Sequence, residues 1–345
     1  MKTATRKPRT VGHGYDIFVK LYLRRSSMQA SFEGIKSEFA RLRRLMQHSG
    51  CWDVPFKAFH IYMWADMEEI MAQGGWVSYI DGRKAKPYSL VSMKRLRLRF
   101  FSFIKHCALR EWLPVETYER LRLLPTPKAG MNGVKIMPPV RAVPVEVCNQ
   151  YEPYVPICLW DFMRLSYLCG GRPGEIACMS LERMRKVEDR VWVYKPPQHK
   201  KLWRLEERDI YLGPQCMKII SLYATLPPSA YLFNFKTMSM QFRQLTSNRQ
   251  QHPRTWRKSS DESDKPVLRW QLHRFFKRAA KFAAENGTDL PRIAPNQLRH
   301  SAATRVRSTY GLEGAAVVIQ DTTTQAQVYA EKHTPLAIQI ARESM

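Results

Sequence analysis

The sequence contains no run of about 20 uninterrupted apolar residues, the length that a helix needs to span a bilayer. Its first residues, MKTATRKPRTVGHG, lack the apolar core of a secretory signal, and no basic amphipathic anchor or lipidation motif is present. The seven cysteines never form a C-x-x-C pair, which argues against a disulfide framework and a zinc site. We therefore expect a cytoplasmic protein with reduced thiols, no membrane partner and no bound metal.

Acidic residues are scarce relative to basic ones. The chain has 56 Lys and Arg residues against 30 Asp and Glu residues, which gives a net charge of +26. Such an excess is unfavourable in a compact molecule, and binding to a polyanion relieves it. Hydrophobic residues make up 44% of the chain, so a core can form, and 345 residues suit two domains plus tails. These properties favour a folded protein that binds nucleic acid.

Two basic amphipathic helices are expected in the first third of the chain. In FEGIKSEFARLRRLMQH (32–48) and SLVSMKRLRLRFFSFIKHCAL (89–109), apolar side chains recur on one face and basic side chains cover the rest. A shorter helix between them ends at Gly74-Gly75. Helices with basic charge of nearly one sign predict a surface that contacts phosphates. The residues expected there are Lys94, Arg95, Arg97, Arg99, Arg41 and Arg44.

A proline-rich segment divides the chain. Residues 124–147 carry five prolines and two glycines without a helical period, which is typical of a semi-rigid linker. We expect a mainly α protein with a small β-hairpin or sheet. The expected parts are a basic flexible arm (1–14), a helical domain (15–123), the linker (124–147), a second domain (148–329) and a C-terminal tail helix (330–345). Within the second domain we expect helices over about 155–169, from Pro173 towards Met184, and over 214–225 and 267–285, with strands in 191–213 and a polar insert at 246–266.

Basic residues occur at three particular points of the second domain. In CGGRPGE, two glycines end one helix and Pro173 begins the next, so Arg172 lies at the corner with Glu175 one turn later. In PPQHKKLW, the lysines at 200 and 201 lie in the hairpin, on opposite faces of an extended chain. In APNQLRHSAATRV, Arg299 opens a helix at the positive end of its dipole, which is unfavourable unless an anion binds there.

These motifs, followed by VIQDTTTQAQVYAEK near the end of the chain, resemble the tyrosine recombinases, also called phage-type integrases. GGRPGEIACMSL is similar to the first arginine box of that family, APNQLRHSAATRV to the second, and QAQVYAEK to the nucleophile box. The resemblance covers most of the chain. It implies a helical core-binding domain and a mixed α/β catalytic domain that close as a C-shaped clamp around double-stranded DNA.

The resemblance implies a role for each matched residue in a site-specific DNA recombinase or integrase of a mobile element. Arg172 and Arg299 would hold the scissile phosphate, and Tyr329 would attack it to form a 3′-phosphotyrosyl link. Lys200, or its neighbour Lys201, would protonate the departing 5′ oxygen. Glu175 would support the first arginine, and His300 would assist beside the second. Neither metal nor ATP nor another cofactor is needed, because the phosphotyrosyl link stores the bond energy for rejoining.

Two positions depart from the family pattern. Asn296 stands where the family usually has histidine or lysine, and either Gln320 or Asp321 stands where it usually has Gly-His or tryptophan. The arginines, the lysine and the tyrosine remain, so we expect an active or slow enzyme. The alternatives are a recombinase-derived DNA-binding protein that no longer cleaves and a type IB topoisomerase-like enzyme. The family's tail docks on a neighbouring subunit to build a tetramer on DNA, whereas this tail could also pack on its own domain.

Overall fold

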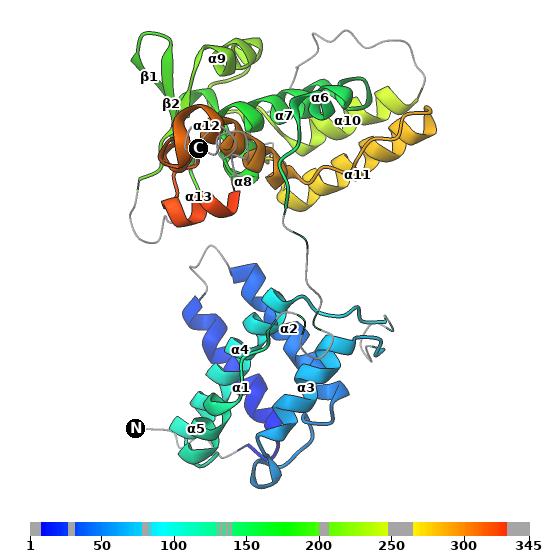
Figure 1. Cartoon of the computed structure of the whole chain (residues 1–345), viewed down its shortest axis with the longest axis vertical. Coiled ribbons are helices and arrows are strands. Elements are labelled where there is room, and N and C mark those ends of the chain that lie inside the picture. Colours follow the sequence, from blue (N-terminus) through cyan, green and yellow to red (C-terminus); the bar gives the residue numbers. More distant parts are fainter. Residues whose placement is uncertain are drawn as a thin grey trace, which may run out of the picture. The chain divides into compact units, whose positions relative to one another are not determined.

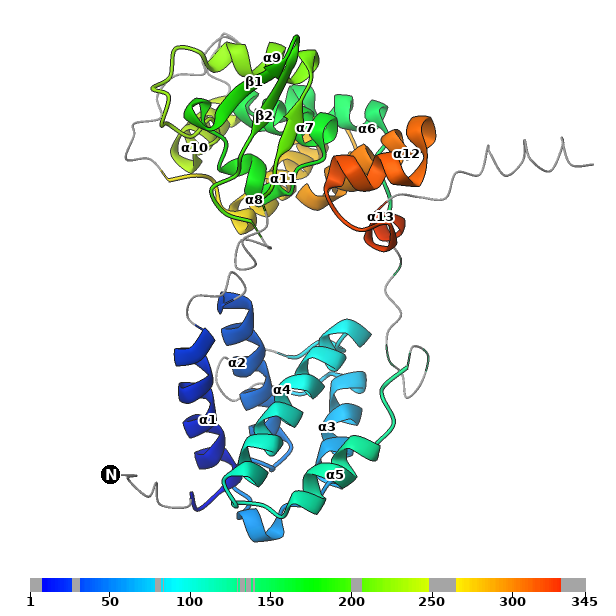
Figure 2. The same cartoon turned by 90° about the vertical axis from the view of Figure 1, so that its left-hand side faces the viewer.

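The computed structural model describes residues 8–26, 32–77, 82, 84–128, 130, 134, 138, 140–199, 207–247 and 265–329. The chain divides into two compact units, residues 1–138 and 139–345, and the boundary falls inside the segment expected to be the linker (Figures 1 and 2). The described residues are mainly helical with one small antiparallel sheet, which confirms the expected fold class. None of their helices is long and apolar enough to cross a membrane.

The first unit is a bundle of helices around one apolar core (Figure 2). Its α-helices in the described part are α1 (Val11–Ser26), α2 (Phe32–His48), α3 (Tyr62–Gln73), α4 (Leu90–Leu109) and α5 (Val115–Leu123). Helix α4 packs against α1, α2 and α5. The predicted apolar faces are buried, with Phe39 and Leu42 of α2 and Phe100 and Ile104 of α4 in the core. The same helical period leaves the basic side chains of Arg41, Lys94 and Arg95 exposed.

Helix α1 begins inside the segment that we expected to be a flexible arm. Val11 and Tyr15 are buried, and the Tyr15 hydroxyl donates a hydrogen bond of 2.8 Å to the main-chain carbonyl of Phe39 on α2. Residues 11–14 therefore belong to the helical unit, because they form the first turn of α1 and Val11 packs in its core. Residues 1–7 of the predicted arm lie outside the described residues.

Gly74 ends α3, as the sequence predicted, with a φ of +62° that side chains rarely adopt. A Cβ atom there would lie 2.5 Å from the backbone nitrogen of Pro87. Gly74→Ala is therefore expected to lower the free energy of unfolding by about 1–3 kcal/mol. Urea unfolding followed by circular dichroism measures this. The control is Gly34→Ala within α2, where a Cβ would meet no described atom within 4 Å and helix propensity should add up to about 1 kcal/mol; equal effects of the two changes would contradict the prediction.

The second unit surrounds a larger core with helices and a three-stranded sheet (Figure 1). Its elements in the described residues are α6 (Val145–Gln150), α7 (Ile157–Cys169), α8 (Pro173–Ala177), β1 (Met184–Glu188), β2 (Val191–Tyr194), β3 (Ile210–Leu212), α9 (Pro214–Ile220), α10 (Phe235–Thr246), α11 (Arg269–Glu285), α12 (Pro295–Ile319) and α13 (Thr323–Tyr329). Strands β2 and β3 pair antiparallel, with Trp192 opposite Leu212 and Tyr194 opposite Ile210. The expected hairpin is therefore present, and β1 adds a third strand beside β2.

The stretch from Pro173 towards Met184 is not the single helix that its apolar period indicated. Helix α8 ends at Ala177, and Ser180 then forms an antiparallel bridge with Tyr231. The backbone N–H of Leu232 donates to the carbonyl of Met179 at 2.9 Å, so the chain is held extended at that point. One turn of 3-10 helix (Leu181–Arg183) then leads into β1. Pairing with a distant segment overrides the local helical pattern at this point.

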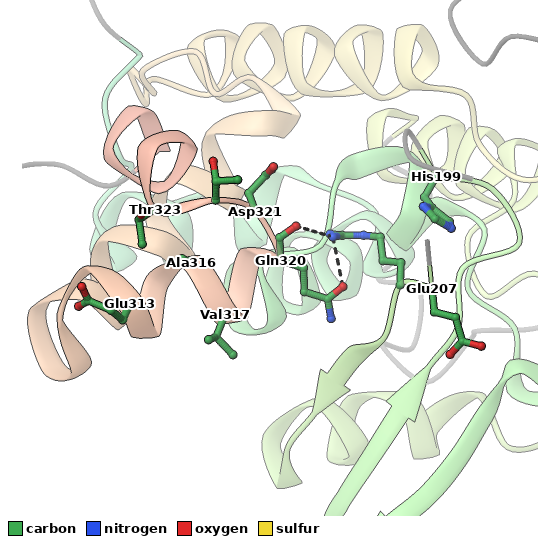
Figure 3. Close-up of a pocket in the computed structure, with 10 residues that line it drawn as sticks. His199, Glu207, Glu313, Ala316, Val317, Gln320, Asp321 and Thr323 are labelled. Atoms are coloured by element: carbon green, nitrogen blue, oxygen red, sulfur yellow. Dashed lines mark hydrogen bonds between the residues drawn. The ribbon is translucent and has the colours of Figure 1, made fainter. Parts of the chain in front are cut away.

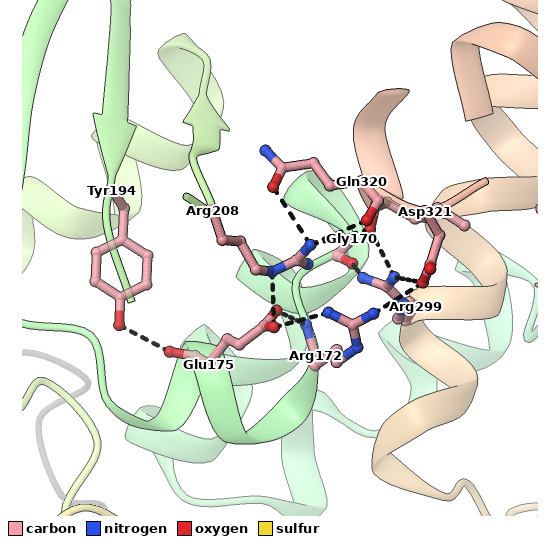
Figure 4. Close-up of polar contacts among 9 residues, drawn as sticks. Gly170, Arg172, Glu175, Tyr194, Arg208, Arg299, Gln320 and Asp321 are labelled. Carbon is pink, nitrogen blue, oxygen red and sulfur yellow. Dashed lines mark hydrogen bonds and ion pairs between the residues drawn. The ribbon is translucent and has the colours of Figure 1, made fainter. Parts of the chain in front are cut away.

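Helix α7 is buried on nearly every side and contacts α8, α9, α10, α12 and β3. Helix α12 kinks at Gly311, where φ is +74° and ψ is −172°, and the segment after the kink leads through Gln320 to α13. Helices α12 and α13 pack together. The end of α7, the start of α8 and the end of α12 therefore meet, and the polar site described below lies at this junction (Figure 4).

Both ends of the linker are anchored, each to its own unit. In the first unit, the Arg97 guanidinium donates to the carbonyls of Leu124 and Pro125. In the second unit, the backbone N–H of Val143 donates to the Ser301 hydroxyl of α12 at 2.8 Å.

Candidate active site

Arg172 lies at the corner between α7 and α8, where the motif predicted it. Gly170 ends α7 in a left-handed conformation, and Pro173 begins α8. The Arg172 guanidinium donates to Glu175 Oε1 at 2.9 Å and to Asp321 Oδ2 at 2.8 Å (Figure 4). Its backbone N–H donates to Glu175 Oε2 at 2.8 Å. Glu175 therefore orients both the main chain and the side chain of Arg172.

Arg299 is fully buried, with 0% of its surface exposed. Its guanidinium donates to the carbonyl oxygens of Gly170 and Ile319, each at 2.6 Å, and to Asp321 Oδ2 at 3.2 Å. This corrects the expectation that Arg299 acts with the N-terminus of its own helix. Helix α12 begins at Pro295, and the guanidinium instead binds the last carbonyls of α7 and of α12 itself, which carry partial negative charge.

Asp321, and not Gln320, reaches these two arginines, which we call the arginine pair (Arg172 and Arg299). A single oxygen, Asp321 Oδ2, accepts hydrogen bonds from both guanidinium groups. Gln320 has a φ of +48° at the C-cap of α12, and its side-chain oxygen accepts from Arg208 at 3.3 Å. The sequence analysis left Gln320 and Asp321 as alternatives for one position. In the structure, Asp321 contacts the arginine pair, whereas Gln320 contacts Arg208.

Arg208 is a site residue that the sequence analysis missed. Its Nε lies 2.7 Å from Glu175 Oε1, and its Nη1 donates to the carbonyls of Ile319 and Gln320 at 3.3 and 3.4 Å. Arg208 therefore connects the segment before β3 to α8 and to the turn that leads into α13 (Figure 4). The signal was present in the alternation of RDIYL, because Arg208, Ile210 and Leu212 share one side of the strand and all three are buried.

Glu175 is the shared counter-ion of two arginines. Burial opposes ionisation of its carboxyl group, but the neighbouring Arg208 and Arg172 charges outweigh that effect, so the pKa of Glu175 lies below its usual value. The Tyr194 hydroxyl of β2 donates to the main-chain carbonyl of Glu175 at 2.9 Å and fixes α8 against the sheet. The carboxylate is therefore ionised and held in position at neutral pH.

The other predicted site residues lie around this network or outside the described residues. Asn296 is half-buried in the first turn of α12, and His300 is buried on the same helix. Tyr329 is the last residue of α13, eight positions after Asp321. Lys200, like Lys201, lies outside the described residues, as does the predicted tail helix over 330–345. The catalytic roles of all of these residues remain predictions.

A cavity of about 600 Å³ borders Asp321 and Gln320 (Figure 3). It is lined by His199, Glu207, Arg208, Glu313, Ala316, Val317, Gln320, Asp321, Thr322 and Thr323. These residues come from the two ends of the β2–β3 connection and from the end of α12 with the turn that follows. Asp321 therefore has the arginine pair on one side and open space on the other.

The basic residues proposed for DNA contact in the first unit are not equivalent. Lys94, Arg95 and Arg41 are exposed, and Arg44 is half-buried. Arg99 is half-buried and donates to Glu38 and to the Tyr22 hydroxyl, both at 2.7 Å. Arg97 is buried, and its guanidinium is bound by Glu68 at 2.9 Å as well as by the linker carbonyls. We therefore correct the assignment of Arg97, because its side chain holds the linker and faces the interior.

Comparison with solved structures identifies the fold. The integrase of the Tn1549 transposon, in complex with a circular intermediate DNA, superimposes with a TM-score of 0.64 at 11% identity, over 98% of this chain and 100% of that one. The chain has the tyrosine recombinase fold. A lambda integrase tetramer bound to a Holliday junction matches with a TM-score of 0.56 at 14% identity, over 95% of this chain and 79% of that chain. XerH recombinase bound to a palindromic difH substrate matches with a TM-score of 0.56 at 12% identity, over 91% of this chain and 80% of that chain.

No protein-family model and no curated protein matches the sequence. The tyrosine recombinase fold is therefore recognised by its architecture and by the order of its short motifs, at identities too low to show more than the fold. Within that fold, the junction of α7, α8 and α12 holds four of the residues that the resemblance selected: Arg172, Glu175, Arg299 and Asp321.

Proposed function

We propose that this protein is a site-specific DNA recombinase that cleaves and rejoins DNA strands through a 3′-phosphotyrosyl intermediate. The observation that supports this most directly is the convergence of the arginine pair on one anionic oxygen. Guanidinium groups are planar, always charged and suited to phosphate oxygens, so the same pair can hold a phosphodiester. The DNA-bound relatives in the structural comparison support the same reading.

The proposed reaction assigns the chemistry to this chain's own side chains. The Tyr329 hydroxyl gives its proton to water and its oxygen attacks phosphorus, so that a Tyr–O–P bond forms and the bond from phosphorus to the 5′ oxygen breaks. Lys200 supplies the proton that the departing 5′ oxygen takes up. Arg172 and Arg299 stabilise the charge that develops on the non-bridging oxygens. Rejoining is the reverse attack by a 5′ hydroxyl, which restores the phosphodiester and releases Tyr329 without ATP.

A suicide-substrate assay tests the proposal. The protein is incubated in EDTA with nicked duplexes from the DNA that flanks its own gene, and the products are separated on a denaturing gel. We expect a slow-migrating covalent protein–DNA band with the native chain and no such band with Tyr329→Phe. The matched control is Tyr310→Phe, an exposed tyrosine on α12 outside the network, which should keep the band. Equal bands from the native chain and Tyr329→Phe would exclude Tyr329 as the nucleophile.

A second candidate function is DNA binding without cleavage. It is favoured by Asn296, which cannot carry a proton at neutral pH, and by Asp321, which places a negative charge at the arginine pair. The same assay separates the two candidates. Duplexes that the native chain binds but to which it never becomes covalently attached would support the binding protein.

DNA binding is expected to use the exposed basic residues of α2 and α4. Lys94→Gln should remove about one phosphate contact, so the slope of log affinity against log salt should fall by about 0.9. The control is Lys57→Gln, an exposed lysine that is not part of either helix, which should leave the slope unchanged. Fluorescence anisotropy with one labelled duplex over a series of salt concentrations measures both slopes. An unchanged slope for Lys94→Gln would remove α4 from the proposed interface.

We further propose that the protein assembles as a tetramer when it joins two duplexes. The related lambda integrase forms a tetramer on a Holliday junction. In this chain, residues 330–345 follow α13 directly and are the segment proposed to dock on a neighbouring subunit. Cross-linking with and without these residues, on the duplexes that give the covalent band, tests the assembly separately from cleavage.

A further inference from the structure

The arginine pair already holds an anion that belongs to the chain itself. Asp321 Oδ2 lies 2.8 Å from an Arg172 nitrogen and 3.2 Å from an Arg299 nitrogen (Figure 4). Carboxylate and phosphate oxygens are equivalent partners for a guanidinium group, because both accept charge-assisted hydrogen bonds at this distance. The Asp321 carboxylate therefore occupies the position in which the pair would hold a phosphate oxygen.

The arginine pair is a built site that does not depend on Asp321 for its shape. The Arg299 side chain is 0% exposed and is fixed by the carbonyls of Gly170 and Ile319. The Arg172 side chain is 20% exposed and is fixed by Glu175, which Arg208 holds in turn. Both guanidinium groups thus keep main-chain or carboxylate partners when the Asp321 carboxylate leaves, so both remain directed at the position that the carboxylate occupied.

The cavity beside Asp321 offers space for a second position of its side chain. Its side chain borders the cavity of about 600 Å³, together with the polar side chains of Gln320, Thr322 and Thr323 (Figure 3). Its backbone N–H is bound to the Ala316 carbonyl at 3.1 Å, so the turn can stay in place while the side chain rotates. Rotation about χ1 would move the carboxylate from the arginine pair towards water in the cavity.

We propose that Asp321 is an internal substitute for the scissile phosphate, held by the arginine pair in the DNA-free protein and displaced into the cavity when a phosphate binds. This proposal rests on the proposed function, which places a DNA phosphate at the same pair. It makes Asp321 a positioning residue that competes with the substrate. The dissociation constant of the pair for any anion is divided by the fractional population of the displaced state, so a free anion binds weakly. A DNA phosphate that other contacts already hold close to the pair has the concentration to displace the carboxylate.

The first test uses inorganic phosphate, which requires no knowledge of the DNA site. Thermal unfolding is measured over a phosphate titration, against equal ionic strength of sodium chloride, for the native chain, Asp321→Asn and Glu313→Gln. Glu313 is the matched control, because it is exposed, borders the same cavity and loses the same charge. We expect Asp321→Asn to bind phosphate at least about tenfold more tightly than the native chain, since two charge-assisted hydrogen bonds become available. Glu313→Gln should bind phosphate as the native chain does.

The melting temperature of the phosphate-free protein is an independent test of the proposal. Without phosphate, Asp321→Asn should melt at a lower temperature than the native chain, because the buried Arg299 and the partly buried Arg172 lose a shared counter-ion, and saturating phosphate should close the difference. Asp321→Ser removes the same carboxylate and should behave in the same way. If the two variants bind phosphate no better than the native chain, or if both remain unfolded at saturating phosphate, the proposal is overturned.

The suicide-substrate duplex separates this inference from the proposed function. Asp321→Asn should give the covalent band faster than the native chain, and Asp321→Asn combined with Tyr329→Phe should give none. Tighter phosphate binding by Asp321→Asn with no band from any chain would support the internal anion and reject phosphotyrosyl chemistry. A band from the native chain that Asp321→Asn forms more slowly, without a gain in phosphate affinity, would support the chemistry and reject the internal anion.

Discussion

Replacing Arg299 with alanine is expected to abolish detectable strand cleavage and to destabilise the second unit. The change removes a proposed donor to the scissile phosphate, and loss of one such donor costs on the order of 100- to 1000-fold in rate. It also leaves the carbonyls of Gly170 and Ile319 without the guanidinium that binds them in the interior. Breaking a buried charged network in this way should lower the free energy of unfolding by about 3–5 kcal/mol. Urea unfolding and the suicide-substrate assay measure the two effects separately.

Two further variants decide whether the effect of Arg299 is specific. Arg299→Lys keeps the charge, but a lysine is a point charge and cannot serve two carbonyls and Asp321 in one planar fork, so cleavage should still fall steeply. Arg305→Ala is the matched control, because Arg305 is exposed on the same helix and donates to the carbonyl of Leu168 at 2.9 Å. We expect a change of less than about 1 kcal/mol for it. Equal stability losses for Arg299→Ala and Arg305→Ala would show that the buried network contributes little.

Replacing Glu175 with glutamine should have the second largest effect, and that effect should depend on pH. The buried Glu175 carboxylate is the partner of Arg172 and Arg208, so its neutralisation leaves both with less compensation. We expect a loss of about 3–5 kcal/mol at pH 7. The two arginine charges hold the pKa of Glu175 below its usual value in spite of burial, so its stabilisation is fully present above the unfolded pKa. That stabilisation is lost as the pH falls through the lower folded pKa.

The stability difference between native chain and Glu175→Gln should therefore be largest above about pH 5 and should shrink below about pH 4. Urea midpoints measured at several pH values for both chains give this difference directly. The control is Glu182→Gln, since Glu182 is exposed and lies 3.6 Å from Arg183, where a surface pair contributes little. A difference for Glu175→Gln that stays constant down to low pH would contradict an ionised, arginine-bound carboxylate.

Secondary structure could be predicted from the sequence wherever a short local pattern of apolar, polar or glycine residues determines it. The apolar faces of α2 and α4, the glycine at the end of α3 and the β2–β3 hairpin follow from spacing within about 20 residues. The strand β1 was missed because MRKVE is largely exposed and charged, so its strand state depends on pairing with β2. Helix α1 was missed because its N-terminus follows a basic stretch that reads as a loose arm.

The site was only partly predictable for a related reason. The two arginine boxes fix Arg172 and Arg299, and the motif places Glu175 one turn from Arg172. The contact between Arg172 and Asp321 joins residues that are 149 positions apart, so no local sequence pattern predicts it. The choice between Gln320 and Asp321 depends on the left-handed turn at the end of α12, which aims their side chains at different arginines.

The anchored linker has a consequence for avidity. Arg97 holds the chain at Pro125, Val134 is buried in the core of the first unit, and Ser301 holds the chain at Val143, so the connection between the units is shorter than the 124–147 segment. Nine peptide steps separate Val134 from Val143, and they limit its reach to about 30 Å even when fully extended. A tether of this size gives an effective concentration in the millimolar range. If both units bind DNA as proposed, attachment of one unit therefore raises the occupancy of the other, and the two should dissociate together when salt weakens both.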